Sequence, residues 1–347
     1  MADKTAIEWT DSTWNPIRAR NIRTGKVGWY CEHATTGCEF CYSERRNKWI
    51  GTGLPFKPGH RKDIELFVDE TMLTQPLRWE KRRMIFVCSM TDLFADFVAD
   101  EWIDRMFAVM ALTPQHTYQV LTKRAERMRD YITDPDDGRG HINTMHRVWD
   151  AAASILKQRR DIDVRAISWD LPGWPLPNIW LGVSAERQQE YDERKEHLRN
   201  TPAAKRFFSM EPLLGPILAD WLGDWVIAGG ESGPKARPIH VDWVRSLRDQ
   251  CANAGVPFFK KQWGEWLPWS QFTGAGIDDD PEQTRFATRE WDGERWNDVG
   301  RPMWCETADG EIDDEQCVGR IGKARAGRLL DGVEHNDFPT RGDGNGI

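Results

Sequence analysis

Three cysteines in one short stretch are the residues of this sequence best suited to chemistry. Cys31, Cys38 and Cys41 fall within eleven residues, with the spacing Cys-x6-Cys-x2-Cys. Thiolates this close together can bind one metal centre, because the shared cation offsets the cost of crowding their negative charges. A structural zinc and a [4Fe–4S] cluster each typically take four protein ligands. Three cysteines with no fourth nearby therefore predict a [4Fe–4S] cluster with one iron open to another ligand.

Two other interpretations of this stretch remain open. His33 could join the three cysteines as the fourth ligand of a Cys3His zinc site. Alternatively, the cysteines could be unliganded, since the Cys-x2-Cys part alone also occurs in redox pairs and zinc ribbons. The third cysteine, and the aromatic Phe40 beside the last one, strengthen the interpretation as a metal site.

The length and composition indicate a globular protein of the reducing cytoplasm. The 347 residues suit one (β/α) barrel of about 250 residues with additions. No apolar run is long enough to cross a membrane and the N-terminus has no apolar signal core, so we expect a cytoplasmic protein without a membrane partner. The seven cysteines are an odd number, which favours ligands and core thiols over disulfides.

The net charge of −8 argues against a protein that coats nucleic acid non-specifically, because such a protein needs a basic surface. A local basic groove is still compatible with it. The 19 tryptophans are expected mostly to pack in the core, with base or sugar stacking as the sharper alternative for a few of them.

Short apolar runs alternate with amphipathic segments over most of the chain, which is typical of parallel strands joined by right-handed helical crossovers. With one strand near the N-terminus, about seven strands are expected. The sequence therefore predicts an α/β fold with a partial or full (β/α) barrel, and an open doubly wound sheet is the alternative. The later strands are predicted at 84–88, 117–121, 178–183, 205–209, 225–228 and 256–263.

The composition also predicts how the chain divides. Residues 1–269 are assigned to the barrel, with an insertion at about 134–177 that is rich in Asp, Gly, Pro and Trp and contains a helix at about 143–158. Residues 270–347 are assigned to a small β-rich appendage and a tail, because residues 270–315 are acidic and lack a helical period and the segment 319–332 is basic. The last residues, 340–347, are expected to be disordered.

Polar residues follow nearly every predicted strand, at the end where a barrel places its active site. Many of them could simply cap helices. Glu211, Glu231 and Lys260, however, follow directly on apolar runs and would be partly desolvated unless paired, so they are the candidate catalytic residues. Gly229 and Gly230 would let the backbone approach a ligand closely. The full set of strand-end residues is Ser89, Asp92, Thr122, Lys123, Ser184, Glu186, Glu211, Glu231, Ser232, Lys260, Lys261 and Gln262.

Several motifs together resemble a known family. They are the cysteine stretch, SMEPLLGP at 209–216, GGESG at 229–233, FFKKQWG at 258–264 and AGRLLDG at 326–332. The chain resembles, over nearly its whole length, the phage-encoded three-Cys-motif proteins of phages and prophages. That family is similar to radical S-adenosylmethionine (SAM) enzymes such as spore photoproduct lyase.

This resemblance implies a [4Fe–4S] cluster on Cys31, Cys38 and Cys41, whose open iron binds the amino and carboxylate groups of SAM. Reductive cleavage of SAM would then give a radical that abstracts hydrogen from the substrate. Phe40 would pack near the adenine of SAM. The resemblance also suggests a nucleotide or nucleic-acid substrate, a co-encoded partner protein and an electron donor of unknown identity.

Two departures from the superfamily pattern concern the SAM site. The first cysteine gap is six residues here, where the superfamily usually has three. The Gly-Gly-Glu element that contacts the SAM amino group normally follows the second strand, whereas here Gly229, Gly230 and Glu231 follow a late one. Ser89 and Asp92 follow the predicted second strand instead, which makes Asp92 the candidate substitute for the amino-group contact.

Two hypotheses from different classes follow. The first is a cytoplasmic, cluster-dependent radical SAM-like enzyme of a phage-infected or prophage-bearing bacterium. The second is a zinc-stabilised protein without catalytic activity, in which the cysteines and His33 hold a loop that contacts nucleic acid or a host protein. Replacement of His33 distinguishes them, because a cluster held by three cysteines should survive it.

Overall fold

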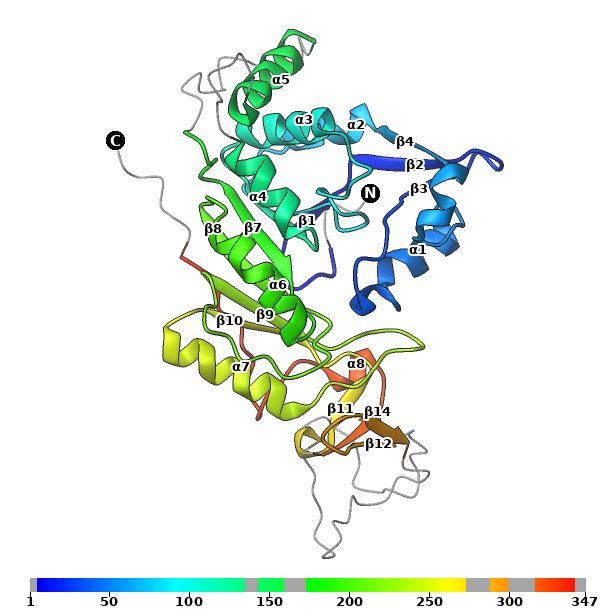
Figure 1. Cartoon of the computed structure of the whole chain (residues 1–347), viewed down its shortest axis with the longest axis vertical. Helices are drawn as coiled ribbons and strands as arrows, with labels where there is room; N and C mark the ends of the chain where they lie inside the picture. The colour runs from blue at the N-terminus through cyan, green and yellow to red at the C-terminus, as the bar shows by residue number, and fades with distance from the viewer. Residues whose placement is uncertain (1–4, 135–142, 159–172, 273–287, 299–315, 341–347) are drawn as a thin grey trace, which may run out of the picture. The chain divides into compact units, whose positions relative to one another are not determined.

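A seven-stranded parallel sheet that curls into a half-barrel is the main feature of the fold (Figure 1). The computed structural model describes residues 5–134, 143–158, 173–272, 288–298 and 316–340. The order of the strands in the sheet is β1-β5-β6-β7-β8-β9-β10. They are β1 (Ser12–Trp14), β5 (Met84–Val87), β6 (Thr117–Thr122), β7 (Ile179–Ser184), β8 (Lys205–Met210), β9 (Trp225–Gly229) and β10 (Phe258–Gln262). The predicted partial (β/α) barrel with about seven strands is confirmed.

The apolar runs explain why these segments form a parallel sheet. Every residue of β5, β7 and β9 is buried, as expected for strands covered on both faces. The pairing is parallel, with Met84 opposite Thr117 between β5 and β6, and Phe207 opposite Trp225 between β8 and β9. The carboxyl ends of neighbouring strands therefore lie at the same edge of the sheet.

The helices follow the predicted amphipathic segments. In α3, Ile103, Met106, Phe107 and Met110 are buried at helical spacing. None of the helices in the described ranges is long and apolar enough to cross a membrane. The helices are α1 (Tyr42–Ile50), α2 (Glu70–Leu73), α3 (Asp100–Ala111), α4 (Ala125–Thr133), α5 (Thr144–Gln158), α6 (Gln188–Arg199), α7 (Val241–Ala254) and α8 (Lys323–Ala326).

Two small antiparallel sheets accompany the half-barrel. The order β11-β14-β12-β13, with β11 (Trp266–Pro268), β12 (Thr288–Trp291), β13 (Trp296–Asp298) and β14 (Cys317–Arg320), makes the predicted β-rich appendage. The order β3-β2-β4, with β2 (Ile17–Asn21), β3 (Val27–Gly28) and β4 (Ile64–Val68), was not predicted. In β2 the two arginines face outward, and of the three inward residues only Ile17 is a large apolar one, so the strand gives little apolar signal.

The chain forms two compact units, each with its own core. The first contains Met1–Val183 with Glu193–Arg206, and the second contains Ser184–Asp192 with Phe207–Ile347. Fully buried tryptophans occur in both, as expected from the composition: Trp9 and Trp14 in the first, Trp225 and Trp263 in the second.

The described cysteines are not all of one kind. Cys31, Cys38, Cys41, Cys88 and Cys251 are free thiols. Cys317 in β14 is disulfide-bonded, so the expectation of ligands and core thiols is wrong for this residue.

The predicted helix of the insertion is confirmed as α5, and the predicted disordered end lies almost wholly outside the described residues.

Candidate metal centre

The three cysteines lie in the loop between β3 and α1, in the first unit. A 3-10 turn over Thr36–Cys38 folds this loop back on itself, because the backbone N–H of Cys38 donates to the carbonyl of Thr35 at 3.0 Å. The N–H of Cys41 then donates to the carbonyl of Cys38 at 3.2 Å. Cys41 is the residue that precedes the first turn of α1, so its thiol faces the positive end of a helix.

The thiols of the loop are close enough to influence one another. Burial raises the pKa of the Cys31 thiol well above its usual range, and the charge of Asp92 acts in the same direction. Cys41 and Cys38 raise the pKa of Cys31 further, whereas Arg124 lowers it. Burial also raises the pKa of Cys41. A lone thiolate is therefore unfavourable here, and a bound cation would be needed to stabilise it.

The loop after β5 holds the cysteine loop at both of its ends. The hydroxyl of Thr91 donates to the carbonyl of Tyr30, just before Cys31, at 2.5 Å. The hydroxyls of Tyr42 and Ser43, just after Cys41, each donate to the carbonyl of Ser89 at 2.9 Å. The cysteine loop is thus fixed against the carboxyl end of β5, where a barrel places its active site.

Asp92 connects this loop to the one after β6. Its carboxylate accepts hydrogen bonds from the Thr122 hydroxyl at 2.7 Å, the Lys123 N–H at 2.9 Å and the Arg124 guanidinium at 3.1 Å. It also accepts one from the N–H of Phe94 at 3.0 Å. These four donors give Asp92 a structural role, and its assignment to the SAM amino group stays a prediction.

Ser89, which was predicted to contact the cofactor, has local partners as well. Its hydroxyl exchanges hydrogen bonds with the side-chain amide of Asn15, at 3.1 and 3.3 Å. Phe40 is half-buried in the cysteine loop. The assignment of both residues to the SAM site stays a prediction.

Two cations lie at the cysteine loop. Arg124, held by Asp92, also donates to the carbonyl of Glu32, next to Cys31, at 3.0 Å. Burial lowers the pKa of Lys123, while the neighbouring Cys38 and Cys41 act to raise it. A cluster bound by three thiolates carries net negative charge, which two adjacent cations would offset.

The three cysteine sulfurs suit a soft metal, but their side chains are not arranged around a common point in this structure. Sulfur ligands of this kind favour zinc or iron–sulfur clusters. Within the described ranges, no three His, Cys, Asp or Glu side chains converge closely enough to hold an ion. Binding would require the three thiols to turn toward one another within the clamped loop.

His33, the alternative fourth ligand, is engaged elsewhere. Its Nε2 lies 2.5 Å from the carboxylate of Glu44 in α1. The Glu44 side chain is buried, and it also accepts from Lys48 and from the N–H of Phe56 at 3.2 Å. This contact anchors α1 to the loop and would have to be rearranged if His33 bound zinc through the same nitrogen.

The other predicted residues lie in the second unit, and Glu231 is paired there. Both of its oxygens bind the guanidinium of Arg237, at 2.8 and 2.9 Å, and one also accepts the Arg237 N–H at 2.9 Å. Such a two-pronged ion pair compensates for the burial of the carboxylate. This arrangement gives Glu231 a structural role.

Glu211 and the two glycines form one packed group. The Glu211 carboxylate accepts from the Lys261 ammonium at 3.2 Å and from the Ser209 hydroxyl at 3.3 Å. A Cβ added to Gly229 would lie 2.4 Å from the other Glu211 oxygen, and one added to Gly230 would lie 1.9 Å from the carbonyl oxygen of Trp263. The chain itself fills the space that these glycines leave.

Lys260 differs from these residues because its charge is not compensated. The residue is completely buried, and its ammonium nitrogen has no hydrogen-bond partner among the described residues. It lies 3.6 Å from the ring centre of Trp263. Burial holds the pKa of Lys260 well below its usual range, and Arg328 acts in the same direction. A buried amine of this kind is typical of functional lysines.

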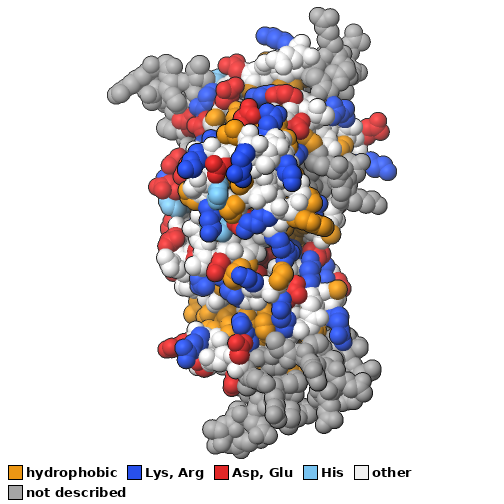
Figure 2. Space-filling view, turned by 90° about the vertical axis from the view of Figure 1, so that its right-hand side faces the viewer, with side chains coloured by type: hydrophobic (Ala, Val, Ile, Leu, Met, Phe, Trp, Pro, Cys, Tyr) orange, Lys and Arg blue, Asp and Glu red, His pale blue; other side chains and the backbone are white. Residues whose placement is uncertain are grey.

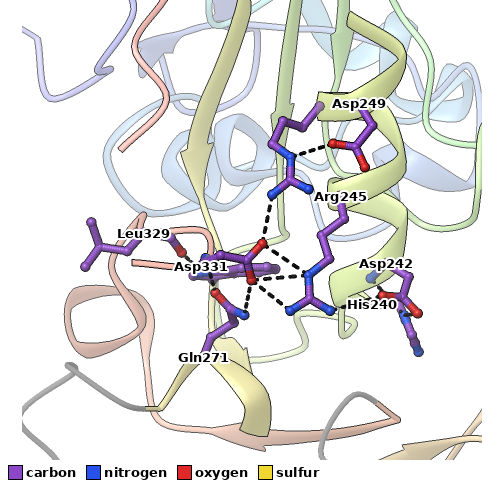
Figure 3. Close-up of polar contacts among 9 residues, drawn as sticks. His240, Asp242, Arg245, Asp249, Gln271, Leu329 and Asp331 are labelled. Atoms are coloured by element: carbon purple, nitrogen blue, oxygen red, sulfur yellow. Dashed lines mark hydrogen bonds and ion pairs between the residues drawn. The ribbon is translucent and has the colours of Figure 1, made fainter. Parts of the chain in front are cut away.

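The motif at 326–332 forms hydrogen bonds with several segments of the second unit. Asp331 accepts hydrogen bonds from Arg245 and Arg248 of α7 and from the Gln271 side chain, at 2.7 to 3.2 Å (Figure 3). The indole of Trp263 donates to the carbonyl of Leu329 at 2.6 Å. This motif therefore fastens the end of the chain to α7 and to the segment after β10.

Cys88 and Arg124 lie at the site but were not predicted as site residues from the sequence. Cys88 is buried directly after β5 with a φ of 56°, and burial raises the pKa of its thiol, with Asp92 and Cys31 acting in the same direction. A left-handed backbone at a residue other than glycine is uncommon and often marks a functional site. The sequence shows only a cysteine after an apolar run, so the backbone angle could not be predicted.

Comparison with known proteins gives one match. A family model described as a protein of unknown function (DUF5131) matches residues 4–339, which is nearly the whole chain. No curated protein and no solved structure matches it.

Proposed function

Because the chain belongs to the DUF5131 family, whose function is unknown, its activity must be argued from its own residues, and we propose that it is a [4Fe–4S]-binding, radical SAM-like enzyme. We place it in the cytoplasm of a phage-infected or prophage-bearing bacterium. Its proposed substrate is a nucleotide or a nucleic acid.

One observation carries this proposal. The loop with the three cysteines is held at both ends against the carboxyl end of β5, and two cations from the loop after β6 lie beside the thiols. A half-barrel offers its strand ends to a ligand, and this loop is in that position. Soft ligands, compensating cations and this position suit an anionic iron–sulfur centre better than a purely structural loop.

The residues of the first unit have separate roles in the proposal. Cys31, Cys38 and Cys41 would hold the cluster, and Lys123 and Arg124 would offset its negative charge. When bound, the cluster would supply one electron for the cleavage of SAM. An electron donor and a co-encoded partner protein are further parts of the proposal.

Within the second unit, taken by itself, Lys260 and Glu211 are the proposed catalytic residues. Burial lowers the pKa of Lys260, so its amine releases a proton more readily than an exposed lysine and can take part in proton transfer. Glu211 has one oxygen without a hydrogen-bond partner in the described part of the chain, so it retains an acceptor for a ligand. Glu231 is proposed to act through Arg237, as a positioning residue.

Metal analysis of protein purified without oxygen tests the proposal. We expect about four irons and four sulfides per chain, and a reduced-state EPR signal that changes on addition of SAM. Cys38→Ala should lose the iron. Cys251→Ala is the matched control, because Cys251 is a free, buried thiol in α7, away from the loop in sequence; it should keep the iron.

Two outcomes would contradict the assignment. Unchanged iron in Cys38→Ala would remove this cysteine from the ligand set. One zinc per chain without iron, lost in His33→Ala, would instead identify a zinc-stabilised binding protein without radical chemistry.

A further inference from the structure

The helix that follows the cysteine loop, α1, buries polar side chains and exposes apolar ones. A surface helix normally buries its apolar residues and exposes its polar ones. α1 turns three polar side chains to the interior: Ser43, Glu44 and Asn47. Trp49, by contrast, is 86% exposed, the highest value among the large apolar residues of the described chain, and Ile50 and the ring of Tyr42 are also exposed. Exposed apolar residues that lie together are typical of interaction sites, whereas single ones are common on any protein surface.

Hydrogen bonds fix this inverted orientation. The Asn47 amide donates to the Thr52 hydroxyl at 2.7 Å and to the carbonyl of Leu54 at 3.0 Å. Its oxygen accepts from the N–H of Trp29 at 2.9 Å and of Thr52 at 3.2 Å. Asn47 thus uses its full hydrogen-bonding capacity inside the protein. The helix cannot roll over to bury Trp49 without losing these bonds.

The exposed side of α1 is also basic. Arg45 and Arg46 are exposed and lie four and three residues before Trp49, so the three side chains share one side of the helix. Neither guanidinium has a hydrogen bond or an ion pair with any described residue. Figure 2 views the molecule from the side on which α1 lies in Figure 1, and shows Lys and Arg side chains beside hydrophobic ones.

The surrounding sequence carries the same charge. Residues 17–63 contain ten Lys or Arg and four Asp or Glu, whereas the whole chain has a net charge of −8. The segment that includes α1 and the cysteine loop is therefore positive within an acidic protein. Such a local field favours an anionic partner and would bring it to this segment.

We infer that the side of α1 formed by Arg45, Arg46 and Trp49 binds single-stranded nucleic acid. The two guanidinium groups suit phosphates, and an exposed indole suits stacking on an unpaired base. A membrane surface would require a longer apolar stripe than the single Trp and Ile of this nine-residue helix. α1 begins directly after Cys41, so a bound strand would lie beside the cysteine loop. The inference rests on the proposed function in one respect: the strand would be a substrate only if the loop holds the proposed cluster.

Fluorescence anisotropy tests the inference. The full-length protein is titrated onto labelled DNA and RNA strands of about 20 nucleotides at several KCl concentrations. We expect Trp49→Ala to weaken binding roughly 5- to 150-fold, the range of one lost base stack. We expect Arg45→Ala/Arg46→Ala to weaken it too, and to reduce the slope of log affinity against log salt by about 1.4.

A second basic pair provides the matched control. Lys81 and Arg82 are also adjacent and exposed, but they precede β5 and so lie at the opposite end of that strand from the cysteine loop. Lys81→Ala/Arg82→Ala should leave both affinity and salt dependence close to those of the unchanged protein. The tighter of the DNA and RNA strands identifies the natural partner.

Three results would overturn the inference. The first is equal binding by the α1 variants and the control. The second is tighter binding to anionic vesicles than to either strand, with loss of vesicle binding in Trp49→Ala. The third is a dimer that Trp49→Ala converts to a monomer. Iron analysis of the same samples separates the two proposals. If the protein contains iron but the α1 variants bind the strands as well as the unchanged protein does, only this inference is rejected. If the protein contains no iron but the α1 variants lose strand binding, only the cluster is rejected.

Discussion

Replacement of Lys260 by methionine should make the protein more stable. The wild-type amine is buried, lacks a hydrogen-bond partner among the described residues and contacts the ring of Trp263. Methionine has a similar length, needs no hydrogen bond and can keep a contact with the indole. Natural proteins retain such destabilising groups mainly where function needs them, so stability and activity should change in opposite directions.

The magnitude follows from three contributions. Burying a polar group without a partner costs roughly 1–3 kcal/mol. A charged amine on an indole would recover up to about 2 kcal/mol, but the lowered pKa of Lys260 reduces the charged fraction and with it this gain. The sulfur–ring contact of methionine adds about 0.3–1.5 kcal/mol. We therefore expect the free energy of unfolding to rise by about 1–2 kcal/mol at pH 7.

The pH dependence identifies the cause. Because the pKa of Lys260 is lowered in the folded state, the unfolded state binds more protons, and this lysine destabilises the protein at pH values below its unfolded pKa of about 10.4. The penalty is largest below the folded pKa and disappears as the pH rises toward 10.4. The advantage of Lys260→Met should accordingly shrink between pH 7 and pH 10.

Urea unfolding at both pH values measures this difference. Lys261→Met is the matched control, since Lys261 is the next residue of β10 and is paired with Glu211 at 3.2 Å. Its replacement leaves a partly buried carboxylate without its ion pair and should destabilise the protein by about 1–3 kcal/mol. If Lys260→Met is less stable than wild type at both pH values, the amine is charged and compensated in the folded protein, and our account of it is wrong.

Two further variants test the second unit. Asp331→Asn should lower the free energy of unfolding by about 1–2 kcal/mol at pH 7, because the partly exposed carboxylate binds two arginines. Hydrogen bonds from Arg245 hold the pKa of Asp331 well below its usual range, so this stabilisation is complete above about pH 4 and declines steadily as the pH falls further; a difference as large at pH 2 as at pH 7 would contradict the argument. Gly230→Ala should cost roughly 1–3 kcal/mol in a thermal unfolding assay, because its Cβ meets backbone, whereas Gly59→Ala, with open space around it, should cost far less. Equal effects of the two glycine variants would refute the packing explanation.

The strands and helices could be predicted because their signals are local. Apolar runs such as 84–87 and 225–229 indicate buried strands, and the spacing of apolar residues in 100–111 indicates a helix on the sheet. The cysteine spacing likewise lies within eleven residues. These features depend on neighbours along the chain, which the sequence shows directly.

The site required the tertiary structure. Sequence placed Asp92 at a strand end as a candidate cofactor contact, and Glu231 and Lys260 at strand ends as candidate catalytic residues. The folded chain pairs Asp92 with Arg124 and Glu231 with Arg237, and leaves Lys260 without a hydrogen-bond partner in the described part of the chain. Whether a buried charge is compensated depends on groups that arrive from other elements.

The sequence by itself therefore determined the α/β class, the positions of the later strands of the half-barrel and of the helices α3 and α5, and the loop that carries the three cysteines. The tertiary structure decided how the cysteine loop is clamped, which carboxylates are already paired, and that α1 turns Asn47 inward and Trp49 outward. The physical reason is that hydrogen bonds and ion pairs between distant segments compensate buried polar groups, and no local pattern in the chain encodes those partners.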